Sequence, residues 1–355
     1  MKKPPLNISG KKRLALILVF FGLPIIYCIG WLILSQWSFH HINKIFIETV
    51  SQHRISAPLK LSRSGFPFSI SWHTEKLKVA TSLLDGELSL QLSDIAFGVS
   101  LLDPTTLKIS AERATLKSTN QQKEISWLFQ SNALKITVNR AVFGKPRLLF
   151  ELETVELLKQ DKTTPNPSWG KHAVTSNMVI TLKKTLQPDS PTQKSAMDIS
   201  VDLKGIRLNP SPFDYFDDIK NAYLDMNIVG FLDASNVGSV VAWRDDGGTI
   251  EIKKLKVDTP PISLEMSGTL SLDQELKPIG AGTVLVYGAE EFVLEKIGVG
   301  DISRTEGLMI QLAISLLPTK MNSDGKLSIQ VPLTAQKGKL QLGPFIITEL
   351  FSIVG

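Results

Sequence analysis

Apolar and polar residues alternate along most of the chain beyond residue 57. The clearest example spans residues 262–272, where every even position except Gly268 is apolar and the odd positions carry Ser, Glu or Thr. The same period of two recurs at Leu88, Leu90 and Leu92; Leu107, Ile109 and Ala111; Leu134, Ile136 and Val138; Met178, Ile180 and Leu182; Ile199, Val201 and Leu203; Ile250 and Ile252; and Leu327, Ile329 and Val331. This period predicts antiparallel strands with one apolar face and one face toward water.

Three Asp-Gly pairs, at residues 85–86, 246–247 and 324–325, punctuate these segments. Asp-Gly suits the tight turns that join antiparallel strands, because both residues tolerate positive φ. We therefore expect a hairpin at each pair.

A helical period is rare in this part of the chain. Residues 212–224 follow Ser211, a suitable N-cap, and begin with Pro212, so we expect a helix there. Two further helices are predicted over residues 290–297 and 306–317, the second ended by Pro318. The apolar segment 344–354 fits either a strand or a helix.

The N-terminal region differs in kind from the rest. Residues 14–35 contain no charged residue, and a 22-residue apolar helix is long enough to cross a bilayer. A cleaved signal would be shorter, and Ile33 is bulky where a peptidase requires a small residue. We therefore expect an uncleaved anchor, followed over residues 36–56 by an amphipathic helix that either packs on the sheet or lies on the membrane surface.

The charge distribution sets the expected topology and excludes one class of partner. Five basic residues precede position 14 without any acidic residue, which leaves 34 basic and 34 acidic residues in the remainder. The positive-inside rule then places residues 1–13 in the cytosol and residues 36–355 across the membrane. A nucleic-acid-binding domain would carry a basic surface of its own, so we expect no nucleic-acid partner.

Residues 57–355 are expected to form one β-rich domain. The polar segments 159–171 and 187–195 are rich in Pro, Thr, Ser and Asn, which is typical of exposed loops. They leave open a division of the sheet into two halves near residues 159–195. The predicted fold class is therefore α+β, mostly antiparallel β, behind an N-terminal transmembrane helix.

No pattern of catalytic, metal-binding or cofactor-binding residues stands out. The five histidines form no ligand motif, and Cys28, the single cysteine, lies inside the predicted span. Asp214, Asp217, Asp218 and Asp225 gather near the predicted helix 212–224, where a solvated helix face explains them better than a site. We expect a protein without catalytic residues, metal or cofactor.

Several short motifs carry a family resemblance. They include Gly65-Phe66-Pro67-Phe68, Trp243 followed by Gly247-Gly248, Gly268 within Ser-Gly-Thr-Leu, and Gly343 before Pro344. In these motifs the chain resembles the DUF2125 family, uncharacterised proteins of alphaproteobacteria. The resemblance implies an inner-membrane protein that faces the periplasm, and it supplies no function. The layout is also similar, more loosely, to AsmA-like envelope proteins.

Two hypotheses for function follow from the alternation. The apolar side chains Leu264, Met266, Leu270 and Leu272 could line a groove that binds lipid or another apolar envelope component. Alternatively they fill a closed core, and the protein is an interaction scaffold for cell-envelope assembly. The alternation is the same in both cases, and it leaves the ligand, the partner and the oligomeric state open.

Overall fold

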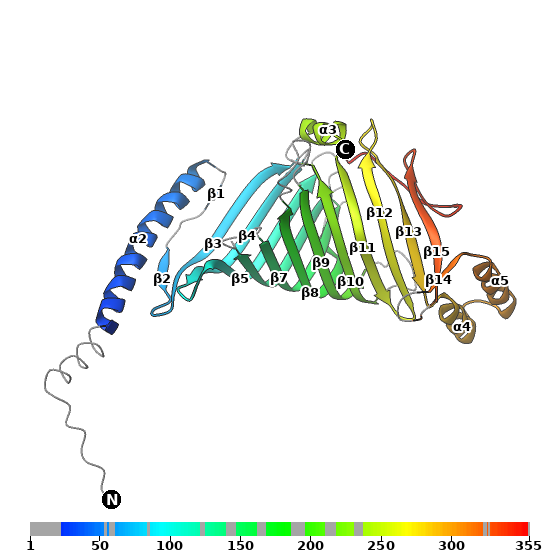
Figure 1. The fold of residues 1–355 in the computed structure, drawn as a ribbon, viewed down its shortest axis with the longest axis horizontal. Helices are drawn as coiled ribbons and strands as arrows, with labels where there is room; N and C mark the ends of the chain where they lie inside the picture. Colours follow the sequence, from blue (N-terminus) through cyan, green and yellow to red (C-terminus); the bar gives the residue numbers. More distant parts are fainter. Residues whose placement is uncertain are drawn as a thin grey trace, which may run out of the picture.

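A computed structural model describes residues 23–52, 55–56, 61–83, 86–120, 125–139, 147–161, 168–185, 196–209, 218–230, 237–321, 325 and 327–353. Its centre is one antiparallel sheet in which most strands pair with their neighbours in sequence (Figure 1). The meander consists of β3 (Ser69–Leu83), β4 (Gly86–Ser100), β5 (Asp103–Asn120), β6 (Ile125–Asn139), β7 (Arg147–Asp161), β8 (Gly170–Thr185), β9 (Ala196–Leu208), β10 (Asp218–Val229), β11 (Thr249–Thr259), β12 (Ile262–Leu272) and β13 (Pro278–Tyr287).

Short strands complete both ends of this sheet. At the first end, β1 (Ile55–Ser56) and β2 (Ser62–Ser64) pair with β3. At the other end, β15 (Leu327–Gln336) pairs with β13 on one side and with β14 (Thr319–Met321) and β16 (Lys339–Leu342) on the other. The last strand, β17 (Phe345–Glu349), pairs with β16 and makes the ambiguous C-terminal segment a strand over those residues. The prediction of a mostly antiparallel β-sheet is confirmed.

The helix α2 (Leu23–Gln52) precedes the sheet. Of the predicted span over residues 14–35, residues 14–22 lie outside the described residues, and residues 23–35 form the first turns of α2. The connecting helix predicted over residues 36–56 continues α2 to Gln52. Within the described part of the chain, no helix combines the length and the apolar character needed to cross a membrane.

The Asp-Gly pairs have different outcomes. Leu83 pairs with Gly86, as expected for a tight hairpin at residues 85–86, although Asp85 itself lies outside the described residues. Gly325 lies between the paired strands β14 and β15, also as expected. The hairpin predicted at residues 246–247 is wrong, because this pair follows the helix α3 (Val237–Asp245), where Gly247 adopts φ 72°. Positive φ after a helix terminates it as effectively as it turns a hairpin.

The helix predicted over residues 212–224 is also wrong in its described part. Residues 218–224 belong to strand β10, which pairs with β9 on one side and β11 on the other. From Ala222 to Ile228 the apolar residues fall on every second position, which favours a strand. This period determines the structure here, despite the helix-initiating residues Ser211 and Pro212. Residues 211–217, including Asp214 and Asp217, lie outside the described residues.

The two later helices are confirmed as α4 (Ala289–Val299) and α5 (Arg304–Ser315). Ser303 Oγ accepts a hydrogen bond from the Glu306 amide, and Glu306 Oε2 accepts one from the Ser303 amide. This reciprocal capping box explains why α5 begins at residue 304.

The polar segments near residues 159–195 do not interrupt the sheet. Strand β8 pairs with β7 from Gly170 to Lys183 and with β9 from Ala173 to Thr185. Residues 162–167 and 186–195, which make up most of those segments, lie outside the described residues.

A crease crosses the strands from β3 to β9. At one level of the sheet, successive strands each contain a residue that is left out of the cross-strand pairing. Asp94, Thr154 and Gly205 are three of these residues, and all three adopt positive φ. Side-chain alternation changes parity there in each strand, while the register between strands is kept. In β4, for example, the apolar side chains are Leu90 and Leu92 before the crease and Ile95 and Phe97 after it.

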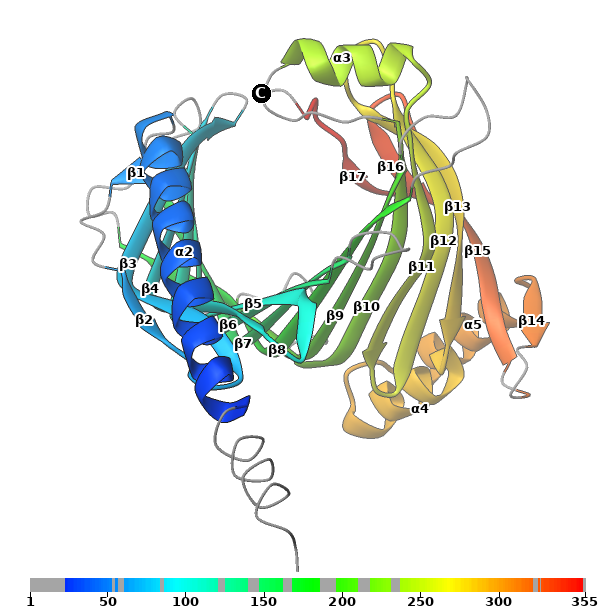
Figure 2. The same cartoon turned by 60° about the vertical axis from the view of Figure 1, so that its left-hand side comes forward.

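Burial within the sheet is concentrated along this crease. The buried residues beside it are Thr74, Leu92, Ile95, Ala111, Ala114, Ser131, Leu134, Val155, Thr175 and Ile206. Cross-strand pairing joins them into two rows on either side of the crease, and both rows lie on one face, because Leu92 and Ala114 pack in one cluster with Ile95, Ala111 and Leu134. A bend toward that face encloses these side chains between the two halves of their own strands. Figure 2 shows the resulting curvature of the whole sheet into a trough.

Buried hydroxyl groups satisfy carbonyl groups at the crease. Ser131 Oγ lies 2.8 Å from the Ala133 carbonyl oxygen and 2.9 Å from that of Glu153. Thr175 Oγ1 lies 2.7 Å from the Lys204 carbonyl oxygen and 3.1 Å from that of Asn177. A buried carbonyl without a partner costs about 1–3 kcal/mol, so these hydroxyls stabilise a bend that would otherwise leave backbone groups unpaired.

We therefore expect Ser131→Ala to lower the free energy of unfolding by about 1–3 kcal/mol. Urea denaturation of the full chain in detergent, followed by circular dichroism, measures this loss. The matched control is Ser267→Ala, because Ser267 is exposed on the other face of the sheet, and its loss should be near zero. Equal losses for the two variants would contradict the role of the hydroxyl at the crease.

Candidate functional site

One face of the sheet carries unbroken rows of apolar side chains that run across the strands. Residues directly opposite in an antiparallel pair project on the same side, so the pairings trace each row from strand to strand. The row called here the central row consists of Trp72, Phe97, Ile109, Ile136, Phe150, Ile180, Val201, Leu224, Leu255, Met266, Val284 and Val331. It crosses every strand from β3 to β13 and ends on β15, and it contains no polar residue.

A second row runs parallel to it along the crease. From Ile95 on β4 it passes through Ala111, Leu134, Leu152, Met178, Leu203, Ala222, Val257, Leu264 and Val286 to Ile329 on β15. The two rows together define the surface that we call the apolar face.

Most of the apolar face is open. In the central row Trp72 is buried, whereas the other eleven side chains are half-buried. Across all described residues only sixteen hydrophobic side chains are buried, and nine of these lie along the crease or on β15. A face packed beneath a second layer would bury its aliphatic side chains almost completely. The described residues therefore provide no covering layer for the middle of the apolar face.

The predicted groove residues lie on this face. Leu264 belongs to the second row, Met266 belongs to the central row, and Leu270 and Leu272 follow on the same side of β12. Gly268 faces Gly282 across the β12–β13 pair, where an added Cβ would approach Ala281 O to 2.6 Å. Ile252 from β11 and Leu340 from β16 line one hollow with these glycines, so the sheet curves toward its apolar face here too.

The first end of the central row meets α2. Trp31 packs with Ile70 and Trp72, and its Nε1 donates a hydrogen bond to the Ser69 carbonyl oxygen at 3.1 Å. Trp31 also makes an edge-to-face contact with Phe66, at 5.1 Å between ring centroids. The Tyr27 hydroxyl donates to the carbonyl oxygen of Pro67. The predicted motif Gly65-Phe66-Pro67-Phe68 is thus the turn between β2 and β3 on which α2 is seated.

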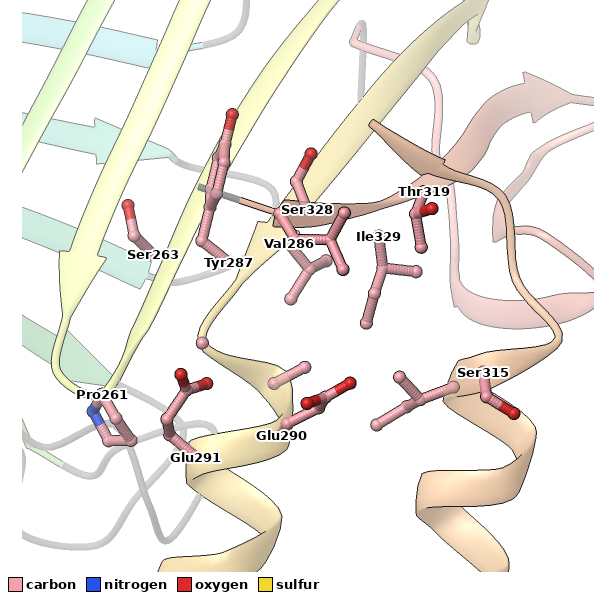
Figure 3. A pocket seen from close by; sticks show the side chains of 14 residues that line it. Pro261, Ser263, Val286, Tyr287, Glu290, Glu291, Ser315, Thr319, Ser328 and Ile329 are labelled. Carbon is pink, nitrogen blue, oxygen red and sulfur yellow. The ribbon is translucent and has the colours of Figure 1, made fainter. Parts of the chain in front are cut away.

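The far end of the apolar face meets α4 and α5. A pocket of about 620 Å³ lies between these helices and strands β12, β13 and β15. Figure 3 shows Val286 and Ile329, the last residues of the second row, directed toward the helices, whereas Tyr287 and Ser328 project to the other side of the sheet. Glu290 and Glu291, at the start of α4, line the same pocket beside Ile314 from α5.

Charged side chains occupy the opposite face. Ion pairs join Lys253 to Asp198 at 2.8 Å, Lys254 to Glu265 at 3.3 Å, and Lys135 to Glu153 at 3.5 Å. The hydrogen bond from Asp198 raises the pKa of Lys253 above its ordinary value. A hollow of about 540 Å³ on this face is lined by polar residues such as Ser71, Lys108 and Glu151. The sheet thus separates an ionised face from an uncharged one.

The remaining motif residues have structural positions. Trp243 on α3 is buried, its Nε1 donates to the Val229 carbonyl oxygen at 2.8 Å, and its ring fills the space above Gly248. An added Cβ at Gly248 would come within 2.2 Å of that ring, so the residue is small to admit the indole. Gly343 adopts φ 58° in the turn between β16 and β17.

Among the residues that the structure describes, no three His, Cys, Asp or Glu side chains come together as metal ligands. Of the Asp residues around the predicted helix, Asp218 and Asp225 lie on β10, and Asp218 is 3.9 Å from Arg207. In this part of the chain, the arrangement with the clearest chemical character is the apolar face, which can bind apolar groups.

The alternation in the sequence predicts fragments of this face but not its continuity. In β4, β5, β6, β8 and β9 the alternation is recognised in one half of the strand, because the crease reverses the parity of the apolar positions in the other half. One signal in the sequence could have revealed the crease. Two consecutive polar or small residues recur between two segments of alternating apolar residues, as at Glu112-Arg113. Helix α3 had no periodic signal strong enough to be predicted.

Comparison with known proteins places the chain in a family. The model of a family described as "Uncharacterized protein conserved in bacteria (DUF2125)" matches residues 57–350. The match includes the sheet from β3 to β17 and its three shorter helices. No curated protein and no solved structure matches this chain.

The openness of the apolar face predicts an asymmetric response to truncation. Leu264→Ala should cost about 1 kcal/mol or less, because an open site leaves no trapped void, whereas Leu134→Ala at the buried crease should cost about 2–5 kcal/mol. Urea unfolding of the delipidated full chain measures both, since a bound lipid would add its own stabilisation. Equal losses above about 2 kcal/mol at both positions would mean that Leu264 lies in a closed core.

Proposed function

The chain belongs to the DUF2125 family, and we propose that it binds the acyl chains of lipids along its apolar face. The single observation that carries this proposal is the central row, twelve paired apolar side chains of which eleven remain half-buried. Its role is binding rather than catalysis, in maintenance of the bacterial envelope or in transport within it.

The chemistry of the face selects apolar ligands. Each methylene group removed from water contributes about 0.8 kcal/mol, so twelve methylenes on this surface would contribute roughly 10 kcal/mol. That gain is comparable to the cost of association, which is about 4–15 kcal/mol. A chain must therefore contact the face over most of its length to bind. Rows that run unbroken across the strands provide such a contact.

The dimensions suit more than one acyl chain at a time. Strands lie about 4.8 Å apart, so the central row extends roughly 50 Å from β3 to β15. One leaflet of a bilayer has a hydrocarbon depth of about 15 Å, half of the whole core. Acyl chains could therefore occupy successive positions along the row, as transport of lipid along the trough requires.

The location of α2 supports a membrane source for the ligand. Ile25, Ile29 and Ile33 are 51–65% exposed on the helix that seats Trp31 at the start of the central row. In the proposed arrangement residues 14–35 anchor the chain in the inner membrane, residues 36–355 lie on the periplasmic side, and the β2–β3 turn that Tyr27 and Trp31 contact lies at the membrane surface. The apolar surface of α2 then leads from the bilayer to the first end of the apolar face.

A scaffold for envelope assembly remains the alternative function, and one observation favours it. Strand β17 is the last strand of the sheet, and its Phe345, Ile346 and Ile347 are 50–70% exposed. An edge strand with exposed apolar side chains can pair with a strand of another protein. This alternative requires no ligand on the apolar face.

A charge placed on the central row tests acyl binding. We expect Ile180→Glu to reduce the lipid that co-purifies with the full chain several-fold, because a carboxylate on the face would have to lose its hydration. Mass spectrometry of the extracted lipids, normalised to protein, measures the change.

The matched control for this experiment is Thr181→Glu. Thr181 is the next residue on the same strand, it is equally half-buried, and it projects to the opposite face. Its lipid content should equal that of the unaltered chain, and circular dichroism confirms that both variants are folded. Equal lipid content in both variants would refute binding on the apolar face and would leave the scaffold as the better hypothesis.

The proposed topology is tested separately by fusions after Gly355. Because the basic residues all precede the proposed span, alkaline phosphatase at this position should be active. Green fluorescent protein exported through the Sec route should be dark there. The reverse pair of results would place the sheet in the cytosol.

A further inference from the structure

The helices α4 and α5 carry many exposed apolar side chains. Most of α5 faces solvent, and the exposed apolar side chains continue onto α4 and onto the strands that follow. We call these residues the hairpin surface: Leu294, Val299, Leu308, Met309, Ile310, Leu312, Leu316, Leu317, Met321 and Leu327. Their exposed fractions range from 40% to 79%.

The size of this surface exceeds what a free protein surface normally shows. At about 30 Å² for each carbon group, ten such side chains at these exposures offer on the order of 700 Å². The largest apolar patch of a typical monomer is about 300–600 Å². A surface of this size is typical of an interaction site.

Its charge pattern identifies the kind of occupant. Residues 307–318 contain no charged side chain, and the apolar residues of α5 cover about two thirds of its circumference, whereas Gly307, Gln311 and Ser315 share the remaining side. An apolar surface of this width on a helix normally packs against protein or lipid. The basic residues Arg304 and Lys320 flank this segment, where long cationic side chains can reach the headgroup level of a bilayer.

The helices are preformed, so the surface does not depend on a protein partner to fold it. Gly307 allows α5 to approach α4 closely, since an added Cβ would come within 2.3 Å of Ile297 Cδ1. Val293 is buried in the same contact, and the Ser303–Glu306 capping box holds the first turn of α5. Two stable helices with a small mutual contact leave their other apolar side chains directed outward.

The hairpin surface is also continuous with the apolar face. Ile314 from α5 and Leu327 from β15 line the pocket that receives Val286 and Ile329, the last residues of the second row (Figure 3). Apolar side chains thus run from the rows of the sheet, along this pocket, to the outer side of α5, and Glu290 and Glu291 also line the pocket. A lipid surface at the hairpin would supply or receive what the rows bind.

We infer that the α4–α5 hairpin inserts into the surface of a lipid bilayer, with residues 307–318 among the acyl chains. Figure 1 shows α2 and this hairpin at opposite ends of the sheet, so the trough contacts lipid at both of its ends. The inference extends the proposed function by giving the far end of the apolar face a membrane contact. The insertion itself rests on the hairpin surface and does not require acyl binding by the rows.

A local fluorescence probe tests the insertion in the full chain. In a Cys28→Ser background, Leu312→Cys is labelled with an environment-sensitive dye and the protein is reconstituted into liposomes. A fraction of the lipid carries a nitroxide quencher on its acyl chain. We expect several-fold stronger quenching at position 312 than at a dye on Ser267→Cys, which lies at an exposed serine on the charged face of β12.

A second labelled site, Leu316→Cys, replaces the first if Leu312→Cys fails to fold, because Leu316 is 79% exposed on the same helix. Absence of quenching at the hairpin overturns the inference. Equal quenching at position 267 also overturns it, since the chain would then adsorb without preference. Energy transfer between labelled copies in place of lipid quenching would assign the hairpin surface to a second copy of the chain.

The two proposals fail in different ways. Quenching at position 312 that persists in an Ile180→Glu background comes from the bilayer and supports the hairpin, whatever the apolar face binds. Quenching that disappears in that background comes from lipid held on the rows and overturns insertion. Unchanged co-purifying lipid in Ile180→Glu, by contrast, refutes acyl binding by the face alone.

Discussion

The structure depends on one constraint: alternation places the aliphatic side chains of eleven consecutive strands on the same face, and the described residues contain no second layer to cover them. Apolar surface left in water destabilises the fold at about 25 cal/mol for each Å². A sheet can reduce that exposure without a partner layer by bending toward its apolar face. The crease from β3 to β9 and the curvature beyond it are this solution, and they bury side chains such as Ile95 and Leu134. The remaining exposure is what makes the face available to a ligand.

The bend is possible because the pairing of neighbouring strands is interrupted at the same level of the sheet. Each strand from β3 to β9 departs from regular pairing at the same level, so the register across the sheet is preserved. The buried hydroxyl groups of Ser131 and Thr175 donate hydrogen bonds to backbone carbonyl oxygens where the ladder is interrupted. Glycines at positions 268 and 282 let the strands approach closely farther along the trough. The polar requirements of the backbone are thus met while the apolar rows stay continuous.

Much of the fold could be predicted from the period of two, because strands such as β12 carry their facing pattern in sequence. The failures have physical causes. Residues 218–224 were assigned to a helix on the strength of Ser211-Pro212, although pairing on both sides makes them a strand. The crease could not be recognised from single strands, since its parity change is meaningful only when neighbouring strands align. Alternation also cannot tell an open face from a closed core, because exposure depends on whether another layer lies above Leu264 or Met266.

The open rows, with α2 at one end and the apolar hairpin at the other, form the proposed path for acyl chains. The most direct test is photo-crosslinking in living cells with a benzophenone side chain in place of Val201, followed by mass spectrometry of the purified chain. Val201 lies in the central row, and Ser200, on the opposite face of the same strand, is the control position. The account predicts adducts of lipid mass at position 201 and none at position 200. Adducts with a protein at position 201, or no adduct there in folded protein, would contradict it.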